Sequence, residues 1–429
     1  MRFGQDMKQS ISTSPVNRRK LLDTPVMALV LRVLFVTLLI AECSFFFLSF
    51  VPTFFLSANN YQSKYLTSLL AVVGLISVLL LSAREGTARR YAFGAPMLLF
   101  VAMCSAAALS SAGYYQSSLG AVMSTAHALI FVPLLYFVFH DSVYDDSLYR
   151  FVVNATLVVA CVYAVLCLLQ AAGFALMNPD FQNFDSRNGR LRLTMSGDFI
   201  AFGAVLALGC AFKGKRNRWV YVAAFLLLVF ELFWVAQTRF LFVGLAFAAL
   251  VGFVIKGNNR VAKVFFILFF SLFAVVQYSD AIYSTLFPQD LNFSTGARLA
   301  AYQFFPTHAA DMGIFGIGFI PNGSPYSELI NVNYATGRGG IDDIGIFEYY
   351  ARFGVAGIAV LIFAIGCFIV RFKRSSRRSL AFYEYPEAWM VLAFFLALVP
   401  TMAITDPQRI FFLPYLVILI ERALGGFYS

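Results

Sequence analysis

Charged residues are scarce in this chain. Only 13% of the 429 residues are Asp, Glu, Lys or Arg, whereas 60% are hydrophobic and the mean hydropathy is +0.77. This balance excludes an ordinary soluble domain. Only three histidines are present, and there is no zinc-finger spacing, HExxH motif or nucleotide-binding P-loop. ATP-driven transport and zinc proteolysis therefore have no support in the sequence.

Cysteine is also rare. All six cysteines lie inside apolar runs without metal-ligand spacing, so we expect packing residues and no disulfide framework. They are Cys43, Cys104, Cys161, Cys167, Cys210 and Cys367. The tail from Met1 to Pro25 is polar and basic, and the apolar run after it is too long for a signal peptide. We expect a retained first helix.

Long apolar runs recur along the rest of the chain. Each is close to the roughly 20 residues that a membrane-spanning helix needs. They fall at 27–55, 66–82, 93–112, 121–139, 151–177, 198–212, 219–237, 240–255, 264–279, 344–370, 389–404 and 410–425. The pattern predicts an all-α polytopic membrane protein with about twelve transmembrane helices.

The distribution of basic residues predicts the orientation of these helices. With the N-terminal tail inside, 22 of the 32 Lys and Arg residues flank the inner ends, and eight flank the outer ends. The positive-inside rule then predicts both termini in the cytoplasm. This distribution also accounts for the net charge of +10 without nucleic-acid binding. The expected organisation is a cytoplasmic tail at 1–25, helices one to nine at 26–279, a periplasmic loop at 280–343, and helices ten to twelve with a short cytoplasmic tail at 344–429.

The outer-side cations are nearly all arginines. They are Lys64, Arg187, Arg190, Arg192, Arg239, Arg298, Arg338 and Arg409. The planar guanidinium matches phosphate oxygens bidentately, so the group predicts an anionic ligand such as a diphosphate. The alternative is contact with lipid headgroups or loop carboxylates. For the three arginines among the acidic residues of 178–198, an ordinary solvated loop is the favoured interpretation.

The loop at 280–343 is too long to be structureless in a compact protein. The stretch from Asn292 to Leu299 predicts a turn followed by a helix. The glycine-rich stretch 312–319 predicts a break in regular structure. We expect the next helix to open with Asp342 and Asp343, either as ordinary N-terminal acids or as groups that accept a hydroxyl proton. Glu348 and Arg352 are four residues apart, so they can pair on one helix face.

Three segments, in order, resemble the superfamily of O-antigen ligases and Wzy-type polysaccharide polymerases. The first is Thr238-Arg239 at the start of a helix. The second is Gly296-x-Arg298 followed by the glycine-rich stretch Gly313-Ile314-Phe315-Gly316-Ile317-Gly318. The third resembles the family's His-Asn, nine residues, Gly-x-x-Gly segment, with Gly354 and Gly357 in register. The likeness covers about 190–370 and implies a GT-C-like membrane glycosyltransferase that uses an undecaprenyl-diphosphate-linked glycan at the periplasmic face of the inner membrane.

One departure shifts the expected activity within this superfamily. Asp343 and Ile344 occupy the positions that resemble the ligases' His and Asn, and His127, His140 and His308 do not fit that place. The resemblance therefore favours a polymerase for O-antigen, capsule or exopolysaccharide. A ligase that transfers glycan to lipid A-core is the alternative, and a lipid-linked glycan flippase is the alternative of another class.

The implied chemistry assigns roles to specific residues. Arg239, Arg298 and Arg338 would hold the diphosphate, and Asp343 would accept the proton, with Asp342 as its substitute. Secondary candidates are Glu348, Arg352, Arg187, Arg190 and Arg192. No metal or other cofactor is expected. The expected partners are the lipid-linked oligosaccharide, membrane lipids and a chain-length regulator.

Overall fold

The protein is almost entirely helical. The computed structural model describes residues 25–42, 61–85, 91–176, 184–187, 190–193, 197–213, 217–256, 292–321, 324–326, 331–334, 337–341, 344–376, 384–400, 402–406 and 409–425. The first six main helices are α1 (Pro25–Glu42), α2 (Tyr61–Glu85), α3 (Gly94–Tyr114), α4 (Leu119–Phe131), α5 (Leu135–Val138) and α6 (Asp146–Ala171). They are followed by α7 (Gly197–Lys213), α8 (Arg218–Glu231), α9 (Arg239–Lys256), α11 (Asn292–Asp311), α12 (Ile346–Ser376), α14 (Pro386–Leu398) and α15 (Phe412–Ala423).

Several helices have the length and composition of membrane spans. Among the described residues, five are long and apolar enough: Gly94–Tyr114, Leu119–Val138, Asp146–Ala171, Arg218–Ala236 and Ile346–Ser375. Shorter apolar helices lie at Tyr65–Leu80, Phe240–Ile255 and Pro386–Leu398. The chain is thus a helical membrane protein. The expected span at 264–279 lies outside the described residues.

The helix α7 lies at the centre of the bundle, packed against α6, α8, α9 and α14. Small residues permit these close contacts. A Cβ on Gly203 would lie 2.7 Å from the Cβ of Ala160, and a Cβ on Gly209 would lie 2.6 Å from that of Glu387. In a membrane, where lipid is as apolar as leucine, close packing of this kind is a main source of helix association.

The cysteines take the packing role that their apolar surroundings indicate. Cys104, Cys161, Cys167, Cys210 and Cys367 are free thiols. Cys104 and Cys167 are fully buried in the main core. Cys43 lies outside the described residues. No disulfide joins the five described cysteines.

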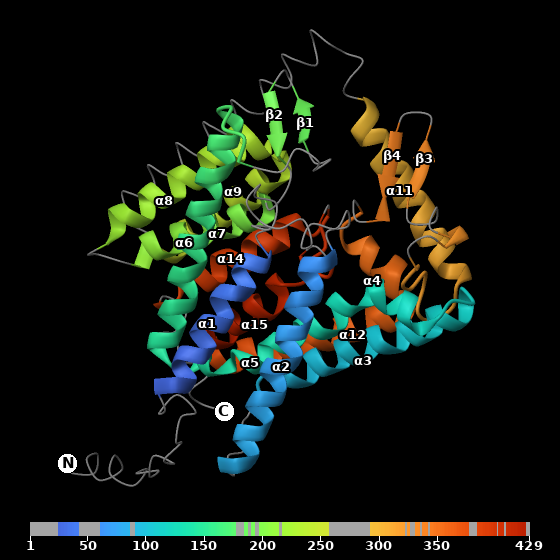
Figure 1. Ribbon diagram of the computed structural model, residues 1–429, viewed down its shortest axis with the longest axis horizontal. Helices are drawn as coiled ribbons and strands as arrows, with labels where there is room; N and C mark the ends of the chain where they lie inside the picture. The colour runs from blue at the N-terminus through green and yellow to red at the C-terminus, as the bar shows by residue number, and fades with distance from the viewer. Residues whose placement is uncertain are drawn as a thin grey trace, which may run out of the picture.

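Two short β-hairpins interrupt the helical pattern, and hydropathy predicts neither of them. Strands β1 (Phe184–Arg187) and β2 (Arg190–Leu193) pair antiparallel, as do β3 (Asn331–Tyr334) and β4 (Gly337–Gly340). The segment expected as an ordinary solvated loop therefore contains paired strands. Both hairpins lie with α11 at the top and right of Figure 1, opposite the start of α1 at the lower left.

Helix boundaries also correct two expectations. Residues 292–299, expected to form a turn followed by a helix, are helical throughout as the first part of α11. The helix expected to open with Asp342 and Asp343 begins instead at Ile346. Its backbone then breaks at Gly354, which has φ 56° and ψ −147°.

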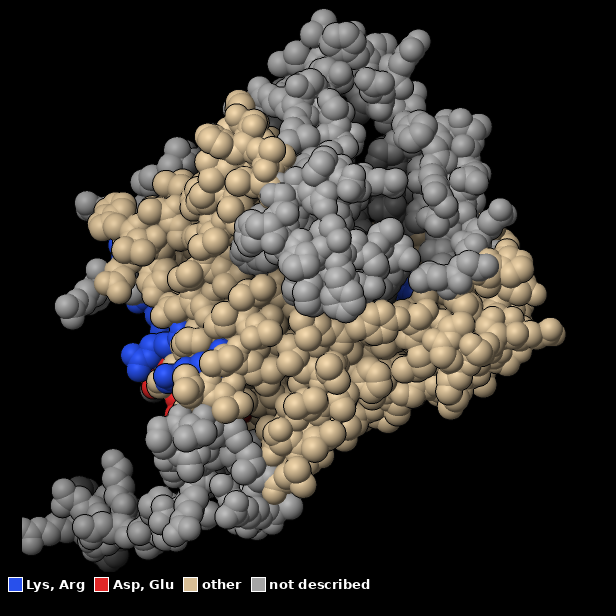
Figure 2. All heavy atoms as spheres, viewed as in Figure 1, with Lys and Arg blue, Asp and Glu red and all other residues tan. Residues whose placement is uncertain are grey.

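Charged side chains gather at the end of the bundle where α6 begins, at the lower left of Figure 2. Lys213 Nζ lies 3.2 Å from Glu387 Oε1 there. Arg422 pairs with Asp146 and donates hydrogen bonds of 2.9 and 3.0 Å to the carbonyls of Ser142 and Val143. These contacts join the end of α7 to the start of α14, and the end of α15 to the start of α6.

Candidate functional site

The glycine-rich segment 313–319 docks into the break of α12. The amide of Ile317 donates to the carbonyl of Ala351 at 2.8 Å, and the amide of Gly318 donates to the carbonyl of Arg352 at 2.9 Å. Beyond the break, the amide of Ala356 donates to the carbonyl of Ile314 at 3.2 Å. The segment therefore supplies partners for backbone groups on both sides of the break.

Glycine is required on both sides of this contact. A Cβ on Gly354 would collide with the carbonyl oxygen of Ile314 and lie 2.6 Å from the amide nitrogen of Gly316. A Cβ on Gly316 would collide in turn with the carbonyl of Ala351. Both glycines have positive φ, which L side chains rarely adopt. The glycines that carry the second and third sequence segments thus meet in space.

Glu348 and Arg352 form the ion pair that their spacing predicts. Arg352 Nη2 lies 3.0 Å from Glu348 Oε1, and Arg352 Nε donates to the same oxygen at 3.2 Å. The Glu348 side chain is only 1% exposed and that of Arg352 only 11%. A charge buried to this extent requires such a partner.

A second, larger ion cluster centres on Arg409, in the link between α14 and α15. Arg409 Nε lies 2.7 Å from Asp198 Oδ2 in the first turn of α7, and Nη1 lies 2.5 Å from Asp406 Oδ2. Burial acts to lower the pKa of Arg409, but the charges of Asp198, Asp406 and Glu348 outweigh it and raise the pKa above its ordinary value. The guanidinium is therefore held positively charged.

The link between α14 and α15 also contacts α11 and the start of α12. The amide of Ile346, at the start of α12, donates to the carbonyl of Val399 at 2.9 Å, and Gly345 packs against Pro400. The Tyr302 hydroxyl of α11 donates to the carbonyl of Pro400. Helices α11, α12 and α14 therefore meet at Pro400.

The first sequence segment joins this region through α7. Before it, α8 continues as a π-helix over Leu232–Ala236, and Gln237 takes a left-handed conformation with φ 51°. A Cβ on Gly197 would lie 3.5 Å from that of Ala236 and 3.7 Å from Leu241 Cδ1. The turn Thr238-Arg239 thus lies beside the start of α7, where Asp198 binds Arg409. We call Asp198, Glu348, Arg352, Asp406 and Arg409 the arginine site.

The other predicted site residues divide into two groups. Backbone positions are described for Arg239 at the start of α9, Arg298 in α11, Arg338 in β4 opposite Asn333, and Arg187, Arg190 and Arg192 in the first hairpin. The side chains of these six arginines, and Asp342 and Asp343 entirely, lie outside what the structure describes. Ile344, directly after Asp343, is fully buried.

Sequence reasoning missed Asp198, Asp406 and Arg409 as a unit. The available signal was an outer-side arginine three residues after Asp406, but the other partner, Asp198, is 211 residues away from Arg409. Each of the three histidines has other contacts. His140 pairs with Glu421 at 3.1 Å, His127 stacks on Tyr65, and His308 Nδ1 lies 2.9 Å from the carbonyl of Phe304.

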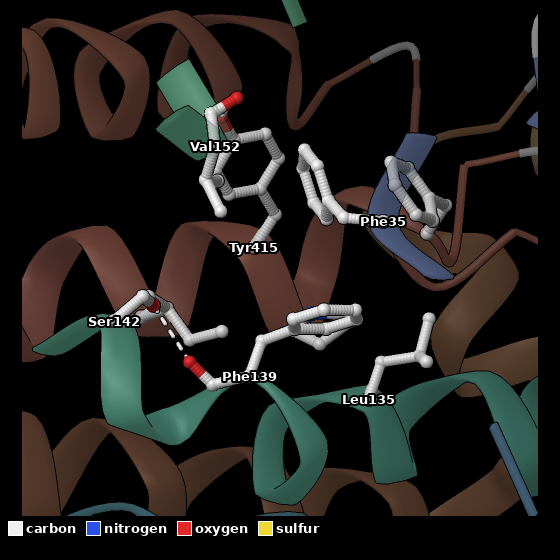
Figure 3. A pocket seen from close by; sticks show the side chains of 9 residues that line it. Phe35, Leu135, Phe139, Ser142, Val152 and Tyr415 are labelled. Atoms are coloured by element: carbon white, nitrogen blue, oxygen red, sulfur yellow. Dashed lines mark hydrogen bonds between the residues drawn. The ribbon is translucent and has the colours of Figure 1, made fainter. Parts of the chain in front are cut away.

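An apolar crevice lies between α1, α5, α6 and α15 (Figure 3). Phe35, Leu135, Val152 and Tyr415 are among the residues that line it. Ser142 also lines the crevice, and its hydroxyl donates a hydrogen bond of 2.6 Å to the carbonyl of Phe139. No charged residue lines the crevice, so it lacks the groups that diphosphate chemistry would need.

The positive charge of the arginine site comes from Arg352 and Arg409. Within the described part of the chain, no group of three or more His, Cys, Asp or Glu residues is arranged to hold a metal ion.

The sequence matches no protein-family model and no curated protein.

Proposed function

We propose that this protein is a polysaccharide polymerase of the bacterial inner membrane. It transfers a growing glycan from undecaprenyl diphosphate to the terminal sugar hydroxyl of a lipid-linked repeat unit. The observation that carries the proposal is the convergence of three distant segments. Gly316 and Gly354 interlock, and the Thr238-Arg239 turn lies beside the start of α7, whose Asp198 binds Arg409.

The proposed topology has about twelve spans, both termini in the cytoplasm, and the arginine site facing the periplasm. Alternating helix directions support it. The end of α7 meets the start of α14 at Gly209 and Glu387, and the start of α9 meets the end of α14 at Gly244 and Leu398. Lys213 lies at the end of the bundle where the end of α7 meets the start of α14. A basic residue at this end agrees with the positive-inside rule if this end faces the cytoplasm.

The proposed reaction displaces a diphosphate from an anomeric carbon. Negative charge grows on the departing phosphate oxygens, so the site needs guanidinium groups that are free to bind them. Arg352 and Arg409 are already engaged with carboxylates, which suits them to position the surrounding helices. We assign phosphate binding to Arg239 and Arg298, which begin or lie within the helices around this site, and to Arg338.

The acceptor hydroxyl must lose its proton as it attacks. We assign this step to Asp343, with Asp342 as the substitute. The buried Ile344 and the hydrogen bond from Ile346 to Val399 anchor the chain just after these residues. The hydroxyl oxygen forms the new glycosidic bond as the bond to the diphosphate breaks. A single displacement of this kind inverts the anomeric centre.

Conservative substitutions test these roles in cells that lack the native gene. Arg239→Lys and Arg298→Lys keep the charge but remove the bidentate fork, and Asp343→Asn removes the base. We expect each to abolish long-chain polysaccharide at normal membrane levels of the protein. Arg374→Lys, at the opposite end of α12, is the matched control and should behave as wild type. Normal polymer from the three site variants would refute the assignments.

Two alternatives make different predictions for the purified protein. A ligase would require lipid A-core as acceptor and would leave lipid-linked repeats unjoined when they are supplied alone. A flippase would move the lipid-linked glycan across a vesicle membrane without forming a glycosidic bond. The break of α12 at Gly354 is the observation that favours a flippase, because transporters use broken helices.

A further inference from the structure

Three tyrosines form a cluster at the end of α3 and on the loop that follows the glycine-rich segment. The ring of Tyr115 lies 5.0 Å from that of Tyr114, edge to face, and 5.1 Å from that of Tyr326. Tyr115 is buried, whereas Tyr114 and Tyr326 are 54% and 42% exposed. The cluster therefore presents two accessible rings supported by a third that is fixed from behind.

The buried ring is bound to the segment that docks into α12. The Tyr115 hydroxyl donates to the carbonyl of Ile317 at 2.6 Å, and the amide of Ile317 donates to Ala351. The next residue, Gly318, donates to the carbonyl of Arg352. One short run of backbone thus connects the tyrosine cluster to the arginine site.

The described residues beside the rings of Tyr114 and Tyr115 are polar but uncharged. Gln116 is exposed and has φ 49°, a conformation that costs energy in a residue other than glycine. Ser117 donates its hydroxyl to the carbonyl of Tyr115 at 3.1 Å, which leaves the lone pairs of its oxygen available. Residues 111–119 contain no charged side chain.

This combination matches the surface of a sugar ring. A pyranose has apolar C–H faces that pack on aromatic rings and hydroxyls around its edge that exchange hydrogen bonds with amides and hydroxyls. A phosphate would instead require basic groups. We propose that Tyr114 and Tyr326, with Gln116, form a subsite for an uncharged sugar residue of the glycan. This inference rests on the proposed function and names a binding site outside the reacting centre.

An aromatic belt at the membrane surface is the competing explanation, since tyrosine is enriched there. A belt residue acts through lipid, so any exposed aromatic ring near the same face would serve. Phe174 provides the matched control, because it is 58% exposed and comes three residues after the end of α6 at Ala171, a helix that contacts β2 of the first hairpin. The two explanations differ in whether Tyr114→Ala and Phe174→Ala have the same effect.

The direct test is binding of a soluble glycan to the purified full-length protein in nanodiscs. The probe is the neutral oligosaccharide pool released by mild acid from the host strain's own polysaccharide. We expect Tyr114→Ala and Tyr326→Ala each to weaken binding about three- to tenfold, the range for loss of one aromatic stacking contact. Tyr114→Phe, which keeps the ring, and Phe174→Ala should stay within about twofold of wild type.

A second readout separates this inference from the proposed function. In complemented cells, Tyr114→Ala should shorten the polysaccharide while Tyr114→Phe restores its length. If the wild-type protein makes no polymer but binds the oligosaccharide through Tyr114 and Tyr326, the proposed function fails and the subsite stands. Wild-type binding by both alanine variants, or equal losses in Phe174→Ala, would overturn the subsite.

Discussion

Gly354→Ala should disrupt the contact between the glycine-rich segment and α12. The native φ and ψ at Gly354 lie in a region that only glycine adopts without strain. Forcing alanine into this conformation costs about 1–3 kcal/mol. The new methyl group would also collide with the carbonyl of Ile314, so the segment must move and lose hydrogen bonds worth about 1 kcal/mol each. We expect a total loss of about 3–5 kcal/mol.

Gly366→Ala is the control in the same helix. A Cβ at Gly366 has no neighbour within 4 Å, so alanine there should stabilise the helix by about 0.5–1 kcal/mol. Thermal unfolding in nanodiscs can be followed with a thiol-reactive dye, because the buried Cys104 and Cys167 become accessible only on unfolding. Gly354→Ala should lower the midpoint by several degrees and reduce polymer formation. Equal midpoints for the two variants would refute this account of the break.

The remaining predictions concern the arginine site. Arg409→Ala removes the guanidinium that pairs with the carboxylate of Asp406, which is 1% exposed, and should cost about 3–5 kcal/mol in thermal unfolding. Adding Asp406→Asn should recover part of that loss, and no recovery would argue against a direct pairing. Glu348→Gln and Arg352→Gln should each destabilise the protein, while the double variant should lose less than the two single losses combined. Additive losses would show that the pair is not coupled.

Helix positions were largely predictable from hydropathy. The apolar run at 198–212 became α7 (Gly197–Lys213), and the run at 240–255 became α9 (Arg239–Lys256). This agreement has a physical cause, since a chain in lipid must satisfy its backbone hydrogen bonds within each span. The pair Glu348–Arg352 was predictable for a similarly local reason, because helix geometry places residues four apart on one face.

Features that depend on distant parts of the chain were not predictable. The break at Gly354 is stabilised by a segment about 40 residues earlier, so hydropathy alone indicated an uninterrupted helix. The partners of Arg409 come from α7 and from its own link, and no local pattern pairs them. The hairpin of β1 and β2 consists of four-residue strands, and its mixed charge resembles that of a solvated loop.

The most direct measurement is synthesis by the purified protein alone. Wild-type protein in nanodiscs is incubated with undecaprenyl-diphosphate-linked repeat units, and the products are resolved by gel electrophoresis. We expect a ladder of products that grow by one repeat unit at a time without lipid A-core, and no ladder from Arg239→Lys or Arg298→Lys. Repeat units that remain unjoined, or that are joined only when lipid A-core is added, would contradict the polymerase assignment.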